Sequence, residues 1–391
     1  MLGVTAFAAA VPTPLYPLYE QTYHFGAAEL GLIFAAYTPG VFLTLFVIAP
    51  QAERIGRRRL LYLGMGLTGL GSVVFAFADG PVWLAVGRVI SGLAVGSVTS
   101  VATAAMSDLE PFRDHHHVAR VAVAANFGAF ALGVLVSGWV TEYVGDAVRL
   151  VYVVPLAASV LGTFAVWATP ESAPPSEPSA RIGIQRISVP TAIRRPFWVA
   201  VGGIAACYSI YGLFAALVPS YLRESAHLAN RFEAGGVVAL MFGLAAIVQL
   251  GTSQIRDRRA LLIGFPLLVG SLVALVLVLR LGSWPFLFLV DGALGTAVGL
   301  AYMGSVTLVD RVAPELLRDE ILAGFYLAGY LALAVPTIGV AEVSESIGLS
   351  GAGALFGMTL AVGAVVLLIA TWGTPTPPGG GGRARGPAAD D

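Results

Sequence analysis

The stretch AERIGRRR, residues 52–59, places four arginines in eight residues, between two long segments that carry no charged side chain. The rest of the chain has a very different composition. Of its 391 residues, 57 % are hydrophobic and 12 % are charged, whereas soluble domains carry about 25 % charged residues. The mean hydropathy is +0.82. These values exclude a soluble globule of this length, so we expect the arginines in a loop between membrane spans.

Segments of about 20 apolar residues, long enough to cross a hydrocarbon core of roughly 30 Å, recur along the chain. Twelve can be placed: 1–19, 30–50, 60–78, 82–107, 121–141, 150–169, 196–222, 234–253, 260–279, 284–309, 321–341 and 350–372. Ten of them contain no Asp, Glu or Arg, while the fourth contains Arg88 and the tenth contains Asp291. The sequence therefore predicts an all-α membrane protein with 12 transmembrane helices.

The arginines also predict an orientation. When loops are assigned alternately to the two sides, 17 arginines fall on one side and four on the other, with Arg88 inside a span. The excess of basic residues marks the cytoplasmic side. We expect a multi-pass protein of the bacterial cytoplasmic membrane with both termini in the cytoplasm. Because the first span has no basic lead, we also expect its cytoplasmic lead to be missing from this sequence.

The chain divides into two parts that resemble each other. Prolines interrupt residues 169–195, which we interpret as a cytoplasmic linker between a half at 1–168 and a half at 196–372; the Gly- and Pro-rich tail at 373–391 is expected to be disordered. RRLLYLG at 58–64 matches RRALLIG at 258–264, and GLAVG at 92–96 matches GTAVG at 295–299. Two matches in order, each in the corresponding span, indicate a six-plus-six duplication.

Three motifs give a family resemblance. APQAERIGRR at 49–58 fits the pattern G-x-L-x-D-R-x-G-R-R, with Glu53 in place of Asp; GRVISGLAVG at 87–96 has an arginine ahead of small residues; GVLVSG at 133–138 departs from G-P-x-x-G-G by Val134 and Ser137. The chain resembles the major facilitator superfamily over nearly its whole length. The resemblance implies two six-helix repeats around a central cavity, while the altered third motif weakens the likeness to proton-coupled drug antiporters.

The resemblance also implies a conformational latch in the basic loop. The residues assigned to it are Glu53, Arg54, Gly56, Arg57, Arg58 and Asp108. Glu53 would lie at the positive N-terminal end of the eleventh span, as the corresponding acid does in the family. Gly56 permits a tight reversal, and Arg57 would pair with Asp108. The alternative is a basic cluster that only fixes the topology.

Arg88 and Asp291 are candidates for coupling, because a charge at membrane depth costs several kcal/mol and is retained for a reason. The two lie 203 residues apart at equivalent places in the repeat. Asp291 would bind a proton from the outside and release it inside, and Arg88 would bias that equilibrium or hold an anionic group. In the alternative interpretation, local backbone or external water satisfies both side chains.

Aromatic and polar residues on the expected cavity helices are the remaining guide to a substrate. They are Tyr16, Tyr37, Asn126, Tyr208, Tyr211, Gln249, Tyr302, Tyr326 and Tyr330. Tyrosine offers an apolar face with one hydrogen-bonding tip, which suits a partly hydrophobic solute; helix packing and an interfacial belt are the alternatives. Pro12, Pro14, Pro17 and Pro336 are expected to kink their helices and leave carbonyls free.

Several functions are excluded or disfavoured. His115, His116 and His117 point about 100° apart on a helix and do not converge on one metal ion. No G-x-x-x-x-G-K-[ST] motif occurs, which excludes transport powered by ATP hydrolysis on this chain. We expect no cofactor, no metal, no nucleic acid and no enzyme activity. The leading hypothesis is a monomeric secondary transporter in the lipid bilayer that exports a small molecule in exchange for protons. Metabolite uptake and a non-transporting sensor or scaffold are the alternatives.

Overall fold

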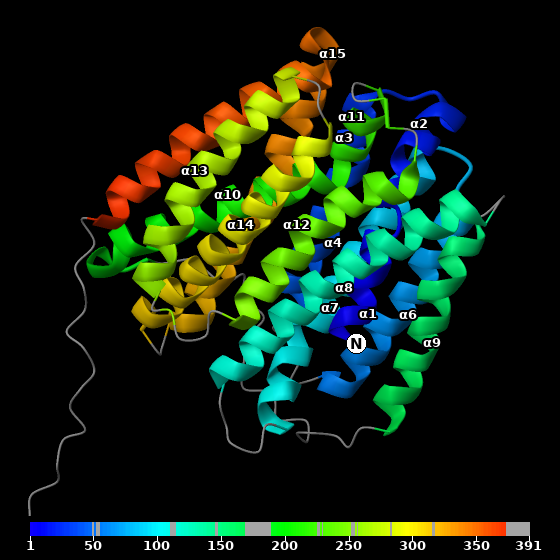
Figure 1. Ribbon diagram of the computed structural model, residues 1–391. Helices are drawn as coiled ribbons and strands as arrows, with labels where there is room; N and C mark the ends of the chain where they lie inside the picture. Colours follow the sequence, from blue (N-terminus) through cyan, green and yellow to red (C-terminus); the bar gives the residue numbers. More distant parts are fainter. Residues whose placement is uncertain are drawn as a thin grey trace, which may run out of the picture.

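The computed structural model describes residues 1–48, 51, 55–109, 115–144, 148–168, 189–224, 227–228, 230–251, 255, 257–281, 284–314 and 317–372. Every element in these ranges is helical (Figure 1). The elements are α1 (Leu2–Ala10), η1 (Thr13–Leu15), α2 (Tyr16–Tyr23), α3 (Ala27–Ala35), α4 (Tyr37–Leu43), η2 (Thr44–Ile48), α6 (Arg57–Ala76), α7 (Pro81–Leu109), α8 (His115–Tyr143), η4 (Leu150–Tyr152), α9 (Val153–Ala168), η5 (Thr191–Ile193), α10 (Arg194–Ala216), α11 (Val218–Glu224), α12 (Arg231–Gly251), α13 (Asp257–Leu281), α14 (Trp284–Val312) and α15 (Arg318–Trp372).

These helices account for the 12 predicted spans. Ten helical stretches are long and apolar enough to cross a membrane. One of them, within α15, carries two spans, because the chain leaves helical geometry at Gly348, where φ is 72° and ψ is 161°. The first span is the series α1 and η1 with residues 16–19 of α2. The all-helical, 12-span fold is thereby confirmed, while the boundaries of the two halves stay a prediction and the tail at 373–391 lies outside the described residues.

The first span is broken where prolines remove backbone donors. Pro12 and Pro14 have no N–H to give to the preceding turn, and α1 ends before them at Ala10. A short 3-10 turn over Thr13–Leu15 leads into α2. The predicted break in this span is therefore present. At Pro336 the helix continues, and the only non-helical residue within α15 is Gly348.

Matched glycines set the spacing of helices in both repeats. A Cβ at Gly92 of α7 would overlap the carbonyl oxygen of Tyr37, and a Cβ at Gly295 of α14 would lie 2.6 Å from the carbonyl oxygen of Met241. α7 therefore contacts α4 through Gly92, and α14 contacts α12 through Gly295, the glycine at the equivalent place in the second repeat. The sequence match between GLAVG and GTAVG corresponds to a shared packing contact.

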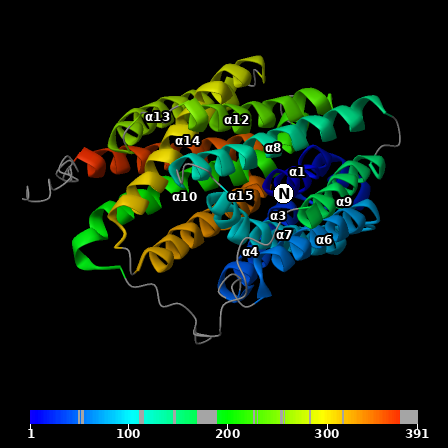
Figure 2. The ribbon, with the colours of Figure 1, turned by 90° about the horizontal axis from the view of Figure 1, so that it is seen from below.

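The first six spans meet the last six along two seams. α8 packs beside α12 and α3 packs beside α15; Figures 1 and 2 show both pairs side by side. The end of the bundle that carries α2 and α11 is called the upper end, after its place in Figure 1, and the end where α6 begins is called the lower end. The upper end is the one predicted to face the exterior.

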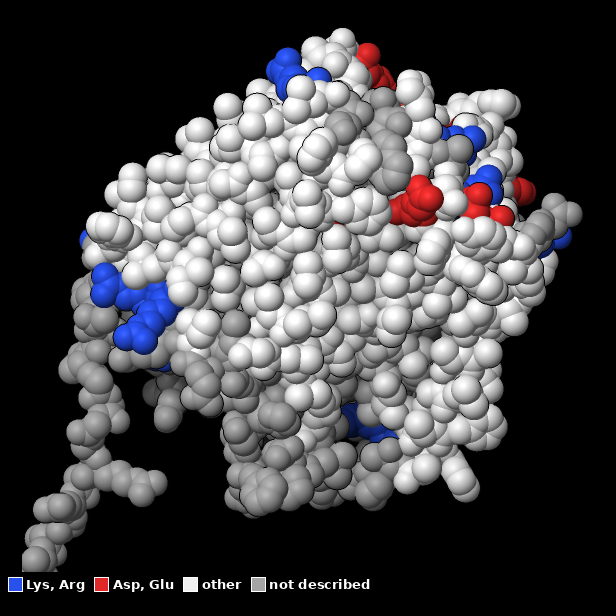
Figure 3. Space-filling view, viewed as in Figure 1, with Lys and Arg blue, Asp and Glu red and all other residues white. Residues whose placement is uncertain are grey.

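The surface suits a bilayer. Leu161 and Leu289 are 69 % and 73 % exposed, and many other large apolar side chains are exposed with them. On the face drawn in Figure 3, the broad middle is free of charged side chains, and the acidic ones gather at the upper end. Contiguous apolar surface of this kind is rare on soluble monomers and is normal against lipid.

We predict that Gly92→Ala and Gly295→Ala each lower the stability of the protein, because the new methyl group would push α7 from α4 or α14 from α12. Overpacking of this kind costs about 1–3 kcal/mol. Gly66→Ala and Gly270→Ala are matched controls, since a Cβ at either position meets nothing within 4 Å. Thermal unfolding in detergent measures the effect, and equal melting temperatures for all four variants would contradict the packing role.

Candidate functional site

Arg88 of α7 is buried among aromatic rings. Its side chain is 2 % exposed, and its guanidinium carbon lies 5.2 Å from the ring centre of Tyr16, 5.1 Å from that of Phe34 and 6.0 Å from that of Phe75. Nε donates a hydrogen bond to the Tyr16 hydroxyl at 2.5 Å, while Nη2 has no partner among the described residues. Ring faces attract a desolvated cation, so the charge is held without an acid from the described part of the chain.

Arg88 also bonds the break in the first span. Its Nη1 donates to the carbonyl oxygen of Ala9 at 2.9 Å, and the Ser137 hydroxyl of α8 donates to the carbonyl oxygen of Val11 at 2.6 Å. At the break, side chains from later spans thus bond these two carbonyl oxygens. A backbone carbonyl therefore satisfies one nitrogen of Arg88, as the alternative interpretation expects, while Nη2 has no partner among the described residues.

Ser137 belongs to the third motif, which departs from the family pattern at this position. The glycines on both sides of it retain a packing purpose: a Cβ at Gly133 would lie 2.5 Å from the carbonyl oxygen of Phe7, and a Cβ at Gly138 would lie 2.8 Å from that of Arg231. α8 therefore contacts the first span through Gly133 and α12 through Gly138. The serine adds a hydrogen bond to the broken span.

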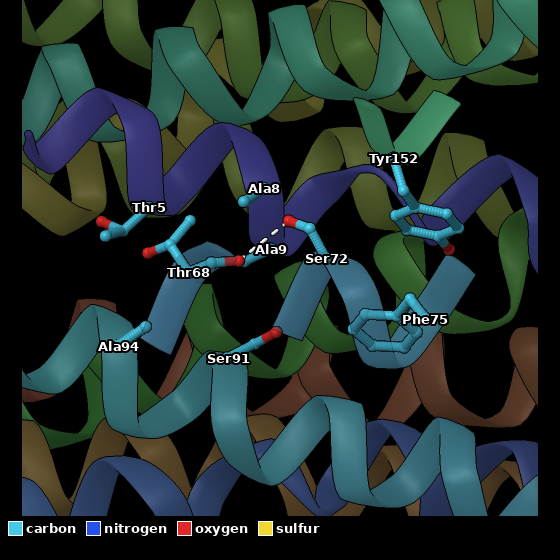
Figure 4. A pocket seen from close by; sticks show the side chains of 9 residues that line it. All are labelled: Thr5, Ala8, Ala9, Thr68, Ser72, Phe75, Ser91, Ala94 and Tyr152. Atoms are coloured by element: carbon cyan, nitrogen blue, oxygen red, sulfur yellow. Dashed lines mark hydrogen bonds between the residues drawn. The ribbon is translucent and has the colours of Figure 1, made fainter. Parts of the chain in front are cut away.

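A small polar cavity lies one helical turn from Arg88. It is lined by side chains from α1, α6, α7 and η4 (Figure 4): Thr5, Ala8, Ala9, Thr68, Ser72, Phe75, Ser91, Ala94 and Tyr152. It has room for about one water molecule. The Ser72 hydroxyl donates to the carbonyl oxygen of Thr68 within α6, and the hydroxyl groups of Tyr152 and Tyr19 are 2.8 Å apart. The polar surroundings of Arg88 are therefore confined to the first repeat.

Asp291 lies at the repeat-equivalent place in α14 and has very different surroundings. Its side chain is 0 % exposed, and neither carboxyl oxygen has a hydrogen-bond partner among the described residues. The backbone of Met241 on α12 faces the carboxyl group. The partners of Arg88 are in the first two spans, so the structure does not pair the two charges with each other.

Aromatic side chains from both repeats meet in the middle of the bundle. The Tyr208 ring centre lies 5.9 Å from that of Tyr211, 6.3 Å from that of Tyr302 and 5.2 Å from that of Tyr330. Tyr37 from α4 lies 6.4 Å from Tyr330. These contacts bring together five residues predicted for the substrate cavity.

Three phenylalanines extend this aromatic cluster. Phe127 of α8 lies 4.8 Å from Tyr211 and 5.4 Å from Tyr302, and Phe242 of α12 lies 5.0 Å from Tyr211 and 4.3 Å from Phe130. They carry no hydrogen-bonding group, so the polar and aromatic–polar pattern on the cavity helices does not include them. Their places near the middle of the fifth and eighth spans, which form a seam between the repeats, were the available signal. The Tyr211 hydroxyl is buried with no partner among the described residues.

The other predicted cavity residues lie apart from these contacts or at their edge. Tyr16 bonds Arg88. Gln249 is 2 % exposed, with Nε2 unpartnered among the described residues, and Asn126 is half-buried on α8. Tyr326 has its ring 5.3 Å from that of Phe325.

The basic loop is described only in part. Glu53 and Arg54 lie outside the described residues, as do the side chains of Asp108 and of His115, His116 and His117, so the latch stays a prediction. Gly56 has φ of 90°, which fits the reversal expected there. Arg57 takes part in an interaction with another group.

Arg58 has a role that the sequence did not reveal. Its Nη2 donates to the carbonyl oxygen of Trp167 at 2.6 Å, in the last turn of α9. Arg258, its counterpart in the matched heptapeptide, donates to the carbonyl oxygen of Trp372 at 3.1 Å, at the end of α15. A cation at a helix C-terminus is stabilising, so one matched arginine caps the last helix of each repeat.

A reciprocal contact joins the repeats at the upper end of the α8–α12 seam. The Glu142 carboxylate accepts the backbone N–H of Arg231 at 2.9 Å, beside the Asn230 side chain that caps α12. The Arg231 guanidinium donates to the carbonyl oxygen of Thr141 at 2.9 Å, near the end of α8. An anion thus lies at one helix N-terminus and a cation at one C-terminus, the favourable sense for both helix dipoles.

We predict that Ser137→Ala lowers the free energy of unfolding by about 1–3 kcal/mol, because the buried carbonyl of Val11 loses its partner. Ser346→Ala is the control, since the exposed Ser346 hydroxyl bonds only its own helix. Thermal unfolding of both variants in detergent is the measurement, and an unchanged melting temperature for Ser137→Ala would mean that another group satisfies the carbonyl.

Comparison with known proteins agrees with this architecture. Residues 1–337 match the family model described as "Major Facilitator Superfamily". The gallate transporter of Pseudomonas putida is 28 % identical over 170 residues, which cover 43 % of this chain and 37 % of that protein. The purine ribonucleoside efflux pump NepI of Shigella sonnei (strain Ss046) is 27 % identical over 269 residues, covering 65 % and 64 %. Both relatives are thus matched over less than two thirds of their own length.

A solved structure extends the likeness to the whole fold. The crystal structure of a D-xylose–proton symporter superposes with a TM-score of 0.74 at 15 % identity, covering 95 % of each chain. Together with the family match over residues 1–337, this shows that the chain belongs to the major facilitator superfamily and is a multi-pass membrane protein.

Proposed function

We propose that this transporter exports a small, partly hydrophobic solute in exchange for protons, by alternating access. The observation that carries the proposal is the unpartnered, fully buried carboxyl of Asp291 in the tenth span. An ionised carboxylate without partners costs several kcal/mol in an apolar interior. The carboxyl therefore holds a proton in this conformation and releases it when water reaches α14 in another one.

The aromatic cluster is the proposed solute site. Its rings come from α4 and α8 in the first repeat and from α10, α12, α14 and α15 in the second. A solute between the two repeats becomes accessible from either side as they move against each other. The tyrosine and phenylalanine rings favour a flat apolar body, and the unpartnered Tyr211 hydroxyl offers one hydrogen bond.

The names of two relatives fit a ring-shaped solute. Gallate and purine ribonucleosides both contain a planar aromatic ring, and the second name is that of an efflux pump. We therefore choose these two classes as the first compounds to test and export as the first direction. The two alternatives to proton-coupled export are uptake of a metabolite and a sensor that transports nothing.

We predict that gallate or a purine ribonucleoside dissipates a pH gradient in inverted vesicles with an acidic lumen, and that Asp291→Asn abolishes this effect. The variant cannot exchange a proton at that position. Asp79→Asn is the control, because Asp79 is an exposed carboxylate outside the spans. Fluorescence of a pH-sensitive dye in the lumen reports the gradient.

Each other outcome has a definite meaning. Dissipation that survives in Asp291→Asn removes Asp291 from coupling. Accumulation of the solute in right-side-out vesicles, without exchange in inverted ones, replaces export by uptake. A wild-type protein that is inserted and folded but moves neither compound class in either direction contradicts the proposed solutes.

We predict that Tyr302→Ala raises the KM for the transported solute by about 2- to 10-fold, because a ring contact is worth about 0.5–1.5 kcal/mol. Tyr302→Phe retains the ring and should have a smaller effect. Phe164→Ala, which removes a 64 % exposed ring from the outside of α9, is the control for a lost aromatic side chain. A KM that is equal in all three variants would place the solute elsewhere.

A further inference from the structure

The upper end of the bundle is closed by polar contacts between α2 and α11. The Ser220 hydroxyl of α11 donates to Oε2 of Glu20 on α2 at 2.6 Å, and the Arg223 guanidinium donates to Oε1 of Gln21 at 2.5 Å. One helix belongs to the first span and the other to the seventh, and both lie at the same end of the bundle in Figure 1. An outward opening of the transporter must separate these groups.

The two helices occupy equivalent places in the repeat. Pro17 and Tyr19 of α2 correspond to Pro219 and Tyr221 of α11, with one residue between proline and tyrosine in each case. Glu20, the first residue beyond the predicted span at 1–19, therefore lies at the contact between repeat-equivalent ends.

Glu20 is partly buried in this contact. Burial raises the pKa of its carboxyl to about 7, and the nearby Glu224 carboxylate acts in the same direction. The Ser220 hydrogen bond and the Arg223 charge act in the opposite direction and are outweighed. The charged side chains that act on it are Arg223 and Glu224, both from α11.

We propose that Glu20 is a proton-binding gate residue: a proton taken up from the solution at the upper end keeps the α2–α11 contact closed. The neutral carboxyl still accepts the Ser220 hydrogen bond and no longer repels Glu224. The ionised carboxylate is more stable in water, and it obtains water when α2 and α11 separate. Acid therefore favours the conformation closed at the upper end, and alkali favours opening there.

The direction and the pH window follow from linkage. In the open form the carboxyl lies in water with its ordinary pKa of 4.5, and in the closed form its pKa is about 7. The closed form binds the proton more tightly, so it gains stability as the pH falls from about 7 to about 4.5. As the pH decreases through this window, the ratio of open to closed molecules falls by up to about tenfold for each pH unit. Above pH 7 the ratio no longer changes through Glu20.

This role goes beyond the proposed function and does not depend on it. Asp291 lies inside a span, whereas Glu20 lies at the end of one and titrates from the upper side. Glu20 would set the conformation in response to the pH on that side even if the transported solute moved without a proton.

The test is a distance measurement by electron–electron double resonance between spin labels at the upper end. Labels are placed at Thr22→Cys on α2 and Leu281→Cys at the end of α13, both exposed, after the single native cysteine is removed by Cys207→Ala. No substrate is added, so the result does not depend on the proposed solutes. In nanodiscs, the fraction of long distances should rise between pH 5 and pH 8.

Variants assign the titration. The variants are made in an Asp291→Asn background, so that a proton on α14 does not contribute. In that background Glu20→Gln, a neutral isostere, should show the short distance at every pH, and Glu29→Gln, a carboxyl removed from α3 at the same end, should titrate like the labelled pair without it. A distance in the Asp291→Asn background that does not depend on pH overturns the proposal, as does a pH dependence that persists there in Glu20→Gln.

Discussion

Backbone polar groups inside a bilayer have no water to bond, and this constraint shapes the first span more than any other part of the protein. Two prolines interrupt the first span after α1, and carbonyls at the break are bonded by Arg88 from α7 and Ser137 from α8. The fourth and fifth spans are therefore attached to the first at a fixed depth. Because α8 also forms a seam with the second repeat, the bonded break helps to set where the two repeats meet.

The two repeats use the same packing for different purposes. Gly92 and Gly295 hold equivalent helix pairs together, yet the residues four positions before them differ in charge. Arg88 lies in a ring-lined site, and the carboxyl oxygens of Asp291 have no hydrogen-bond partner among the described residues. The cation has bonding partners within its own repeat, whereas the carboxyl has none among the described residues.

Much of the fold could be predicted from the sequence, because span length and hydropathy are one-dimensional properties. The 12 spans, the broken first span and the matched glycine motifs follow from composition, prolines and spacing. Side-chain partners could not be predicted in the same way. The cap that Arg58 gives to Trp167 joins residues 109 positions apart, and Phe127 carries no polar group that would single it out. The contact of Glu20 with Ser220 depends on how the repeats are placed against each other, which no local pattern encodes.

The paired caps on Trp167 and Trp372 have a consequence for how this protein arose. Each cap ties the start of a third helix to the end of a sixth, so each repeat is a closed six-helix unit with its own terminal bond. A duplicated gene would pass on such a bond twice without change, since it concerns only the integrity of the unit. Positions 88 and 291, by contrast, carry opposite charges, so the two repeats differ there while they share the cap.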